Sequence, residues 1–227
     1  IYNGVLYMFR AQNYLSLPKL KTLMTYPAAK SGTEYTVQAD TDTIYGLAFM
    51  NCTSLSEIKL PDTVKDIHTE AFMGCTSLRS IAFPEKVHSV YPATFCGCTS
   101  LEEVYLPNSV TSIGIKAFYG CSSLEDFVFP EYLHTVYQEA FMGCTALTDI
   151  FLPDTLTALE NEAFRGCEML MNVDIPDSVS YVGDMVFEGT PWLYSGYEWK
   201  IAGSSLMRYT GSEEKVTVPD GVTTICG

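Results

Sequence analysis

Cysteine offers more possible chemistry than any other residue in this sequence, which contains eight of them. A cysteine can act as a nucleophile, a metal ligand or half of a disulfide, and each role requires its own spacing and neighbours. Six of the eight follow one another at a constant interval of 23 residues, as Cys52, Cys75, Cys98, Cys121, Cys144 and Cys167. A constant interval of this length predicts a repeat protein in which these cysteines form one column.

Stacked repeats place neighbouring members of such a column about 4.8 Å apart. Their side chains then point the same way, whereas a disulfide needs Cβ atoms that converge. The closest pair in the sequence, Cys96 and Cys98, has neither the spacing nor the histidine partners of a zinc site. We therefore expect the six column cysteines to be buried free thiols that pack as small apolar side chains. Cys96 and Cys226 lie outside the column and are better candidates for exposed or reactive thiols.

The other candidates for catalysis or metal binding are few. Of the three histidines, His68, His88 and His134, the last two share a column but lie two repeats apart, about 10 Å, which is too far for a shared ligand or a proton relay. An acidic file follows the prolines, and its spacing is compatible with calcium, but Pro-Asp favours a type I turn and no repeat supplies enough oxygens for Ca²⁺. Its members are Asp62, Glu85, Asn108, Glu131, Asp154, Asp177 and Asp220. The sequence therefore predicts turns here, and a protein that has no catalytic residues, no metal and no cofactor.

One repeat, residues 101–121, illustrates the elements that we expect in every coil and that place the cysteines and the other repeated residues in columns. Val104 alternates with its outward-facing neighbours Glu103 and Tyr105, which is the period of a short strand. Pro107 cannot donate to a ladder, so it ends the strand and begins a turn. Further along each repeat, phenylalanine and then glycine close the opposite side in an irregular or 3₁₀ turn. Stacked in register, the units predict a right-handed solenoid with short parallel strands, and an interval of 20–29 residues is typical of leucine-rich repeats.

The outward strand positions are the best candidates for binding. In three neighbouring repeats an apolar residue follows a carboxylate by two positions, as Glu103 and Tyr105, Asp126 and Val128, and Asp149 and Phe151. An exposed apolar strip with a charged rim is typical of a protein interface, and the concave sheet of a solenoid is where we expect it. The alternative is a strip that only stacks on itself, because cross-strand aromatic and β-branched pairs stabilise sheets.

Charge and composition narrow the class of partner. Apolar residues make up 47% of the chain, enough for a sizeable core, and 27 acids against 13 bases give a formal charge of −14. This charge argues against nucleic acid and against anionic membrane as partners. The sequence contains no run of 18 apolar residues, so we expect no membrane insertion in this segment. It also starts without methionine or a leader, which favours a segment of a longer protein.

We predict a single domain over residues 1–227, because a solenoid has one continuous core. Within it we expect an irregular unit at 1–34, regular 23-residue repeats at 35–190, an inserted hairpin-like unit at 191–214 and the start of a further repeat at 215–227. Each irregular unit is predicted as a strand pair, the second one formed by Trp192-Leu193 and residues 206–209. Such units would cover or space the coils.

The stretch Ala71 to Leu78, which reads AFMGCTSL, is followed by Ile81-Ala82-Phe83-Pro84. This pattern resembles the BspA-like (Treponema pallidum-type) leucine-rich repeat family, and the GVLY at 4–7 and LMRYTG at 206–211 resemble further units of it. The resemblance covers nearly the whole chain. It implies a leucine-rich repeat fold and a bacterial surface or secreted protein, with adhesion as the role implied for some members, and it associates no catalytic residue with the repeat.

We therefore expect a non-enzymatic, protein-binding module of an exported bacterial cell-surface protein, located outside the cell. It would engage a protein on a host or microbial surface through the solenoid face. Two alternatives remain, namely a structural spacer that presents another domain and a glycan-binding surface built from tyrosines and acids. The sequence predicts no particular oligomeric state.

Overall fold

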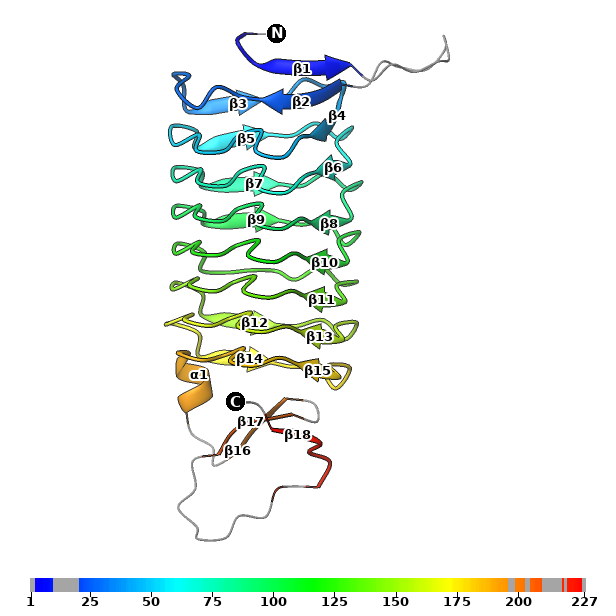
Figure 1. Ribbon diagram of the computed structural model, residues 1–227, viewed down its shortest axis with the longest axis vertical. Helices are drawn as coiled ribbons and strands as arrows, with labels where there is room; N and C mark the ends of the chain where they lie inside the picture. The colour runs from blue at the N-terminus through cyan, green and yellow to red at the C-terminus, as the bar shows by residue number, and fades with distance from the viewer. Residues whose placement is uncertain are drawn as a thin grey trace.

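The structure, a computed structural model, describes residues 3–9, 21–195, 199–202, 205–209, 218 and 220–225. Its body is a β-solenoid of about 7 turns with a spacing of about 23 residues, which confirms the predicted fold class. The coils lie one above another as an upright column, and in the view of Figure 1 this column is nearly straight. Each coil has three sides, formed by two ladders of short strands and by a side of tight turns.

The first ladder consists of three-residue strands that end just before the prolines, where the period-two pattern predicts them, or in the case of the first strand just before Gln38. They are β3 (Glu34–Thr36), β5 (Glu57–Lys59), β7 (Ser80–Ala82), β9 (Glu103–Tyr105), β12 (Asp149–Phe151) and β14 (Asn172–Asp174). Pairing is parallel and in register, so that Ser80 faces Glu103 and Asp149 faces Asn172. Residues 126–128 hold the same place in the coil between β9 and β12, but they contribute only an isolated bridge from Asp126 to Asp149. The ladder is therefore divided into β3-β5-β7-β9 and β12-β14.

The strands of the second ladder are β2 (Lys21–Thr25), β4 (Thr41–Ile44), β6 (Asp66–Ile67), β8 (Ser89–Val90), β10 (Ser112–Ile113), β11 (Thr135–Val136), β13 (Ala158–Leu159) and β15 (Tyr181–Val182). From β6 onward, each of them follows a turn that begins at a proline. They form two parallel groups, β2-β4-β6 and β8-β10-β11-β13-β15, and β1 (Leu6–Phe9) pairs antiparallel with β2. In the turn itself the carbonyl of the proline accepts a hydrogen bond from the residue three places on, as from Val110 to Pro107 at 3.0 Å. This is the i to i+3 bond of the predicted β-turn.

The third side is a stack of buried phenylalanines. Phe49, Phe72, Phe95, Phe118, Phe141, Phe164 and Phe187 are each 0% exposed. The ring centroids of neighbours are 5.0 to 5.5 Å apart, and the planes are close to parallel. Tyr26 takes the same place one coil earlier, stacks on Phe49 at 5.5 Å, and donates its N–H to the Ala48 carbonyl at 2.7 Å. The stack thus extends into the segment 1–34, which the sequence indicates as irregular.

The turns on this side contain two left-handed residues per coil. The second is the glycine of the motif, as at Gly74 and Gly120, except in the coil of Leu47, where it is Asn51 with a φ of 57°. The first is never glycine, and its φ lies between 53° and 64° at Leu47, Glu70, Ala93, Lys116, Glu139, Glu162 and Met185. Non-glycine residues adopt this conformation at a cost. Among the described residues these turns form no 3₁₀ helix, so they are of the irregular kind.

Near the end of the solenoid, helix α1 (Pro191–Tyr194) covers the last phenylalanine. The Trp192 ring lies 4.7 Å from that of Phe187, and the Thr190 hydroxyl caps the helix by accepting from the Leu193 N–H at 3.2 Å. The prediction of a strand at Trp192-Leu193 is therefore wrong, because a threonine cap followed by proline favours a helical start. An antiparallel pair follows, β16 (Trp199–Ala202) and β17 (Ser205–Tyr209), and β18 (Thr224–Ile225) joins β17 in parallel.

Candidate functional site

The column cysteines lie in the interior and serve the fold. Cys52, Cys75, Cys98, Cys121, Cys144 and Cys167 are free and buried. From Cys75 onward each thiol donates to the phenylalanine carbonyl of the coil before it, with Sγ to O distances of 3.0 to 3.3 Å. Burial raises the pKa of Cys121 and Cys144 well above the usual range and that of Cys167 to about 12. Cys96 is half-buried, and burial also raises its pKa, whereas Cys226 lies outside the described residues.

The histidines and the acidic file lie at the surface. His88 and His134 are exposed, and the Nδ1 atom of His88 is 3.3 Å from the Ser109 carbonyl. In the acidic file, Asn108 bridges to the next coil through bonds to the Glu131 carboxylate and N–H, at 3.2 and 3.0 Å. Within the described ranges, no three His, Cys, Asp or Glu side chains come together as a metal site.

The predicted strip faces solvent on the first ladder. Tyr105 is 60% exposed, Val128 81% and Phe151 70%, which are high values for large apolar side chains. The Tyr105 hydroxyl donates to Glu103 at 2.6 Å, and this bond raises the pKa of the phenol. Donation from the Asn172 amide lowers the pKa of Asp149. These bonds between outward-facing side chains hold two of the three carboxylates beside the apolar strip.

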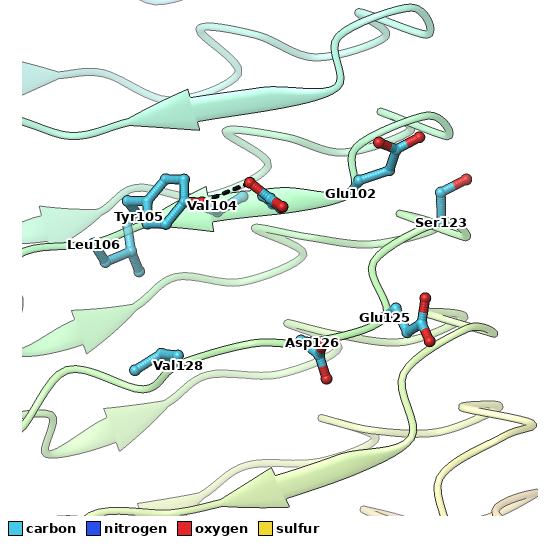
Figure 2. Close-up of a pocket in the computed structure, with 9 residues that line it drawn as sticks. Glu102, Val104, Tyr105, Leu106, Ser123, Glu125, Asp126 and Val128 are labelled. Atoms are coloured by element: carbon cyan, nitrogen blue, oxygen red, sulfur yellow. Dashed lines mark hydrogen bonds between the residues drawn. The ribbon is translucent and has the colours of Figure 1, made fainter.

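A pocket of about 530 Å³ opens in the middle of this face, between β9 and the next coil. Figure 2 shows its two walls, with Glu102, Val104, Tyr105 and Leu106 on one coil and Ser123, Glu125, Asp126 and Val128 on the other. The structure thus brings four of the predicted strip residues together, namely Tyr105, Val128, Glu103 and Asp126. It does not bring Phe151 into this group. Phe151 borders a separate hollow with Met171 and Trp192.

The pocket lies where the first ladder is interrupted. In this ladder the N–H of the residue after each column leucine donates to the equivalent carbonyl one coil earlier, with N to O distances of 2.7 to 3.3 Å. The donors are Ser56, Arg79, Glu102, Thr148 and Met171. Among the described coils from Ser56 onward, Glu125 is the one member of this series whose N–H does not make the bond, which would reach the Glu102 carbonyl. We call this missing pairing of β9 with residues 125–128 the ladder gap.

The size of one core side chain accounts for the ladder gap. From Ile58 onward the inward residue at this place is β-branched in every coil but one, as Ile58, Ile81, Val104, Ile150 and Val173, and the exception is Phe127. Tyr35 holds the same place in β3, but it is only half-buried in the first strand of the ladder, and β3 still pairs with β5 there. The Phe127 ring is buried edge-on against Phe118 at 5.2 Å and Phe141 at 4.8 Å. A tightly packed core has no spare volume for a larger side chain, so the backbone moves instead. Sequence reasoning missed this pocket, although an aromatic residue with β-branched residues in the coils on both sides of it was a visible signal.

The family comparison agrees with this architecture. The family described as the BspA type leucine rich repeat region, with 6 copies, matches residues 28–147, 89–201 and 114–226. The chain belongs to this family. No curated protein matches it. The repeat that the sequence indicates, with its cysteine, phenylalanine and proline columns, is therefore the repeat of that family.

Solved structures of bacterial leucine-rich repeat proteins share the fold. The T. pallidum leucine rich repeat protein is 29% identical over 76% of this chain and 82% of its own, with a TM-score of 0.69. A leucine rich cell surface protein from Faecalibacterium prausnitzii A2-165 is 23% identical over 97% of this chain and 64% of its own, with a TM-score of 0.73. A leucine-rich repeat protein from Bacteroides ovatus is 23% identical over 100% of this chain and 60% of its own, with a TM-score of 0.66. The chain thus spans less than two thirds of the length of the last two.

Family and fold favour a binding surface over a catalytic cleft as the candidate site. Proteins of this family and this fold are typically non-catalytic, and their repeats generally mediate protein interactions. Among the described residues no helix has the length and apolar character needed to cross a bilayer. The candidate site is therefore a surface, and its distinctive part is the pocket beside Tyr105.

Proposed function

We propose that this chain is a non-enzymatic, protein-binding module of an exported bacterial cell-surface protein, and that it binds its partner through the outward face of the first ladder. Adhesion to a host or microbial surface is the biological role that fits such a module. The proposal is supported by family membership and by the likeness to a protein named as a cell surface protein.

One observation carries the proposal, namely the exposure of the strip. Tyr105, Val128 and Phe151 stand 60% to 81% exposed in neighbouring coils, although the fold does not need them there. Lys59, Ala82 and Asp174 occupy the same column in other coils, so the position tolerates charged and small residues. Exposed aromatic side chains beside carboxylates are typical of interface anchors. Tyr105 also borders two hollows, and side chains of a partner can fill them.

The test is partner capture by the immobilised chain from a panel of purified host matrix and plasma proteins and bacterial surface proteins. We expect the double variant Tyr105→Ala with Phe151→Ala to lose at least about tenfold in affinity, because truncating central aromatic anchors usually costs about 2 kcal/mol or more. Its melting temperature should stay unchanged, because the rings are exposed. The matched control is Tyr132→Ala with Met169→Ala, which removes side chains 51% and 55% exposed from outside the strip.

Full capture by the double variant would remove the strip from the proposal. Should the wild-type chain bind no protein of the panel and no glycan of an array, the spacer function would replace the binding function. Glycan binding without protein binding would instead favour the third function considered above, with the same double variant showing whether the strip is used.

A further inference from the structure

The pocket at the ladder gap has an apolar base and an acidic rim. Val104, Leu106 and Val128 supply apolar surface, and the carboxylates of Glu102, Glu103, Glu125 and Asp126 surround it. Among the described residues that line the pocket none is basic. Arg79 contacts this rim, with its Nη1 atom 2.7 Å from the Glu102 carboxylate. The rim therefore keeps an excess of negative charge, in a chain whose formal charge is −14.

Tyr105 adds a face that suits a cation. Its hydroxyl donates to Glu103 at 2.6 Å, so the ring and the carboxylate are held in a fixed relation to each other. An ammonium or guanidinium group placed over the ring can also contact the carboxylate. An apolar base next to such a group matches the side chains of lysine and arginine, which combine an aliphatic stem with a charged head.

The ladder gap also leaves main-chain groups available on both walls. The Glu125 N–H lacks the bond that its counterparts make to the preceding coil, and the Glu102 carbonyl lacks the same bond as acceptor. Main-chain groups at an open strand edge are the groups that an extended peptide pairs with. A small free cation cannot hydrogen-bond to both the Glu125 N–H and the Glu102 carbonyl. A peptide segment can, because it offers a carbonyl and an N–H together with its side chain.

From this geometry we infer that the pocket receives a lysine or arginine side chain of an extended segment of a protein partner, with arginine preferred for its planar fork. The inference deepens the proposed function and rests on it for the identity of the partner as a protein. The head group contacts the carboxylate rim and Tyr105, the stem lies on Leu106 and Val128, and the segment's main chain meets Glu102 and Glu125. Phe127 has the role of a positioning residue, because it keeps the two walls apart.

The experiment measures binding of a short peptide of alternating threonine and valine that carries one central arginine and a neutral dye. The same peptide with glutamine at the centre, and propylguanidine alone, are the comparison ligands. We expect the arginine peptide to bind at least about tenfold more tightly than either, because the glutamine peptide lacks the charge and propylguanidine lacks the main chain. Equal affinity for propylguanidine would overturn the assignment of a peptide segment.

Two variants probe the pocket in different ways. Glu125→Gln with Asp126→Asn keeps the shape and removes two charges, and Phe127→Ile keeps all charges and lets the walls approach. Each should weaken the arginine peptide at least about tenfold. The control, Glu85→Gln with Asp177→Asn, removes the same charge from exposed turns and should leave the affinity within about twofold. An equal loss in the control would show attraction by net charge only and would sink the inference, even if Phe127→Ile fails to fold.

The outcomes separate this inference from the proposed function. If the arginine peptide does not bind while a panel protein is still captured through Tyr105 and Phe151, the pocket inference fails alone. If the peptide binds with the expected dependence on Glu125 and Asp126 while no protein is captured through the strip, the pocket stands and the proposed use of the strip fails.

Discussion

The phenylalanine side and the first ladder are built from the same repeat, but only the phenylalanine side is uniform. The rings from Phe49 to Phe187 stack without interruption, and the column thiols bond from coil to coil alongside them. The first ladder changes its outward residue in every coil and loses its pairing at Phe127. The comparison shows that the phenylalanine side repeats the same buried contacts in every coil, while the outward positions of the first ladder are free to vary and thereby to acquire a specific surface.

The largest expected effect concerns the uniform side. Phe72→Ala removes a fully buried ring that stacks on Phe49 and Phe95 at 5.2 and 5.3 Å. We expect a loss of about 3–5 kcal/mol in the free energy of unfolding, measured by urea denaturation. Phe151→Ala on the varied side should cost less than about 0.5 kcal/mol. Comparable losses in the two variants would break the comparison.

The second prediction concerns alkaline pH. Burial raises the pKa of Cys144 well above the value of about 8.5 for an unfolded chain. A raised folded pKa gives stability that is fully present below pH 8.5 and is lost as the pH rises toward the folded pKa, because the unfolded thiol ionises first. We expect wild type to lose about 2 kcal/mol more than Cys144→Ala between pH 8 and pH 10. Parallel pH curves for the two proteins would contradict the burial of this thiol.

The third prediction tests the left-handed turn residues of the uniform side. Ala93 has a φ of 53°, which glycine adopts without strain, so Ala93→Gly should stabilise the protein by about 0.5–1 kcal/mol in thermal unfolding. Gly120 has a φ of 69° and open space around an added Cβ. Gly120→Ala should therefore destabilise by a similar amount through backbone strain alone. Shifts of the same sign in both variants would show that backbone conformation does not decide stability here.

The smallest expected effect on stability comes from making the varied side regular. In Phe127→Ile the lost aromatic packing is offset by regained ladder bonds, so the free energy of unfolding should change by about 1 kcal/mol or less. The Glu125 amide should nevertheless exchange its hydrogen at least about tenfold more slowly, because it regains the Glu102 carbonyl as acceptor. Hydrogen exchange followed by NMR provides the measurement. A Glu125 amide that is already protected in wild type would disprove the ladder gap.

Much of the fold could be read from the columns themselves. The alternation around Val104 predicts a strand ending before Pro107, and the structure has β9 there. The outward placement of Tyr105, Val128 and Phe151 also follows from that alternation. What could not be read depends on volume and on neighbours. Phe127 fits the apolar pattern of the sequence. Its size leads to the ladder gap only because its ring packs against Phe118 and Phe141.

The local sequence led to a wrong prediction at Trp192-Leu193 and contained no signal for the left-handed turn residues. Trp192 and Leu193 have strand-like composition, but Thr190 and Pro191 start a helix that covers Phe187. The first left-handed residue of each turn is not a glycine, so the sequence does not mark it, and the stacked coils hold it in place despite its conformational cost.

The sequence by itself determined that equal positions of successive repeats lie above one another, since a constant interval of 23 residues with constant core residues allows few other ways to bury them. It thereby also determined which side chains face outward. The tertiary structure alone decided where neighbouring coils part and which outward residues share one pocket. Those outcomes depend on how much volume each core side chain occupies against its neighbours in space, and a pattern of apolar and polar letters does not contain that quantity.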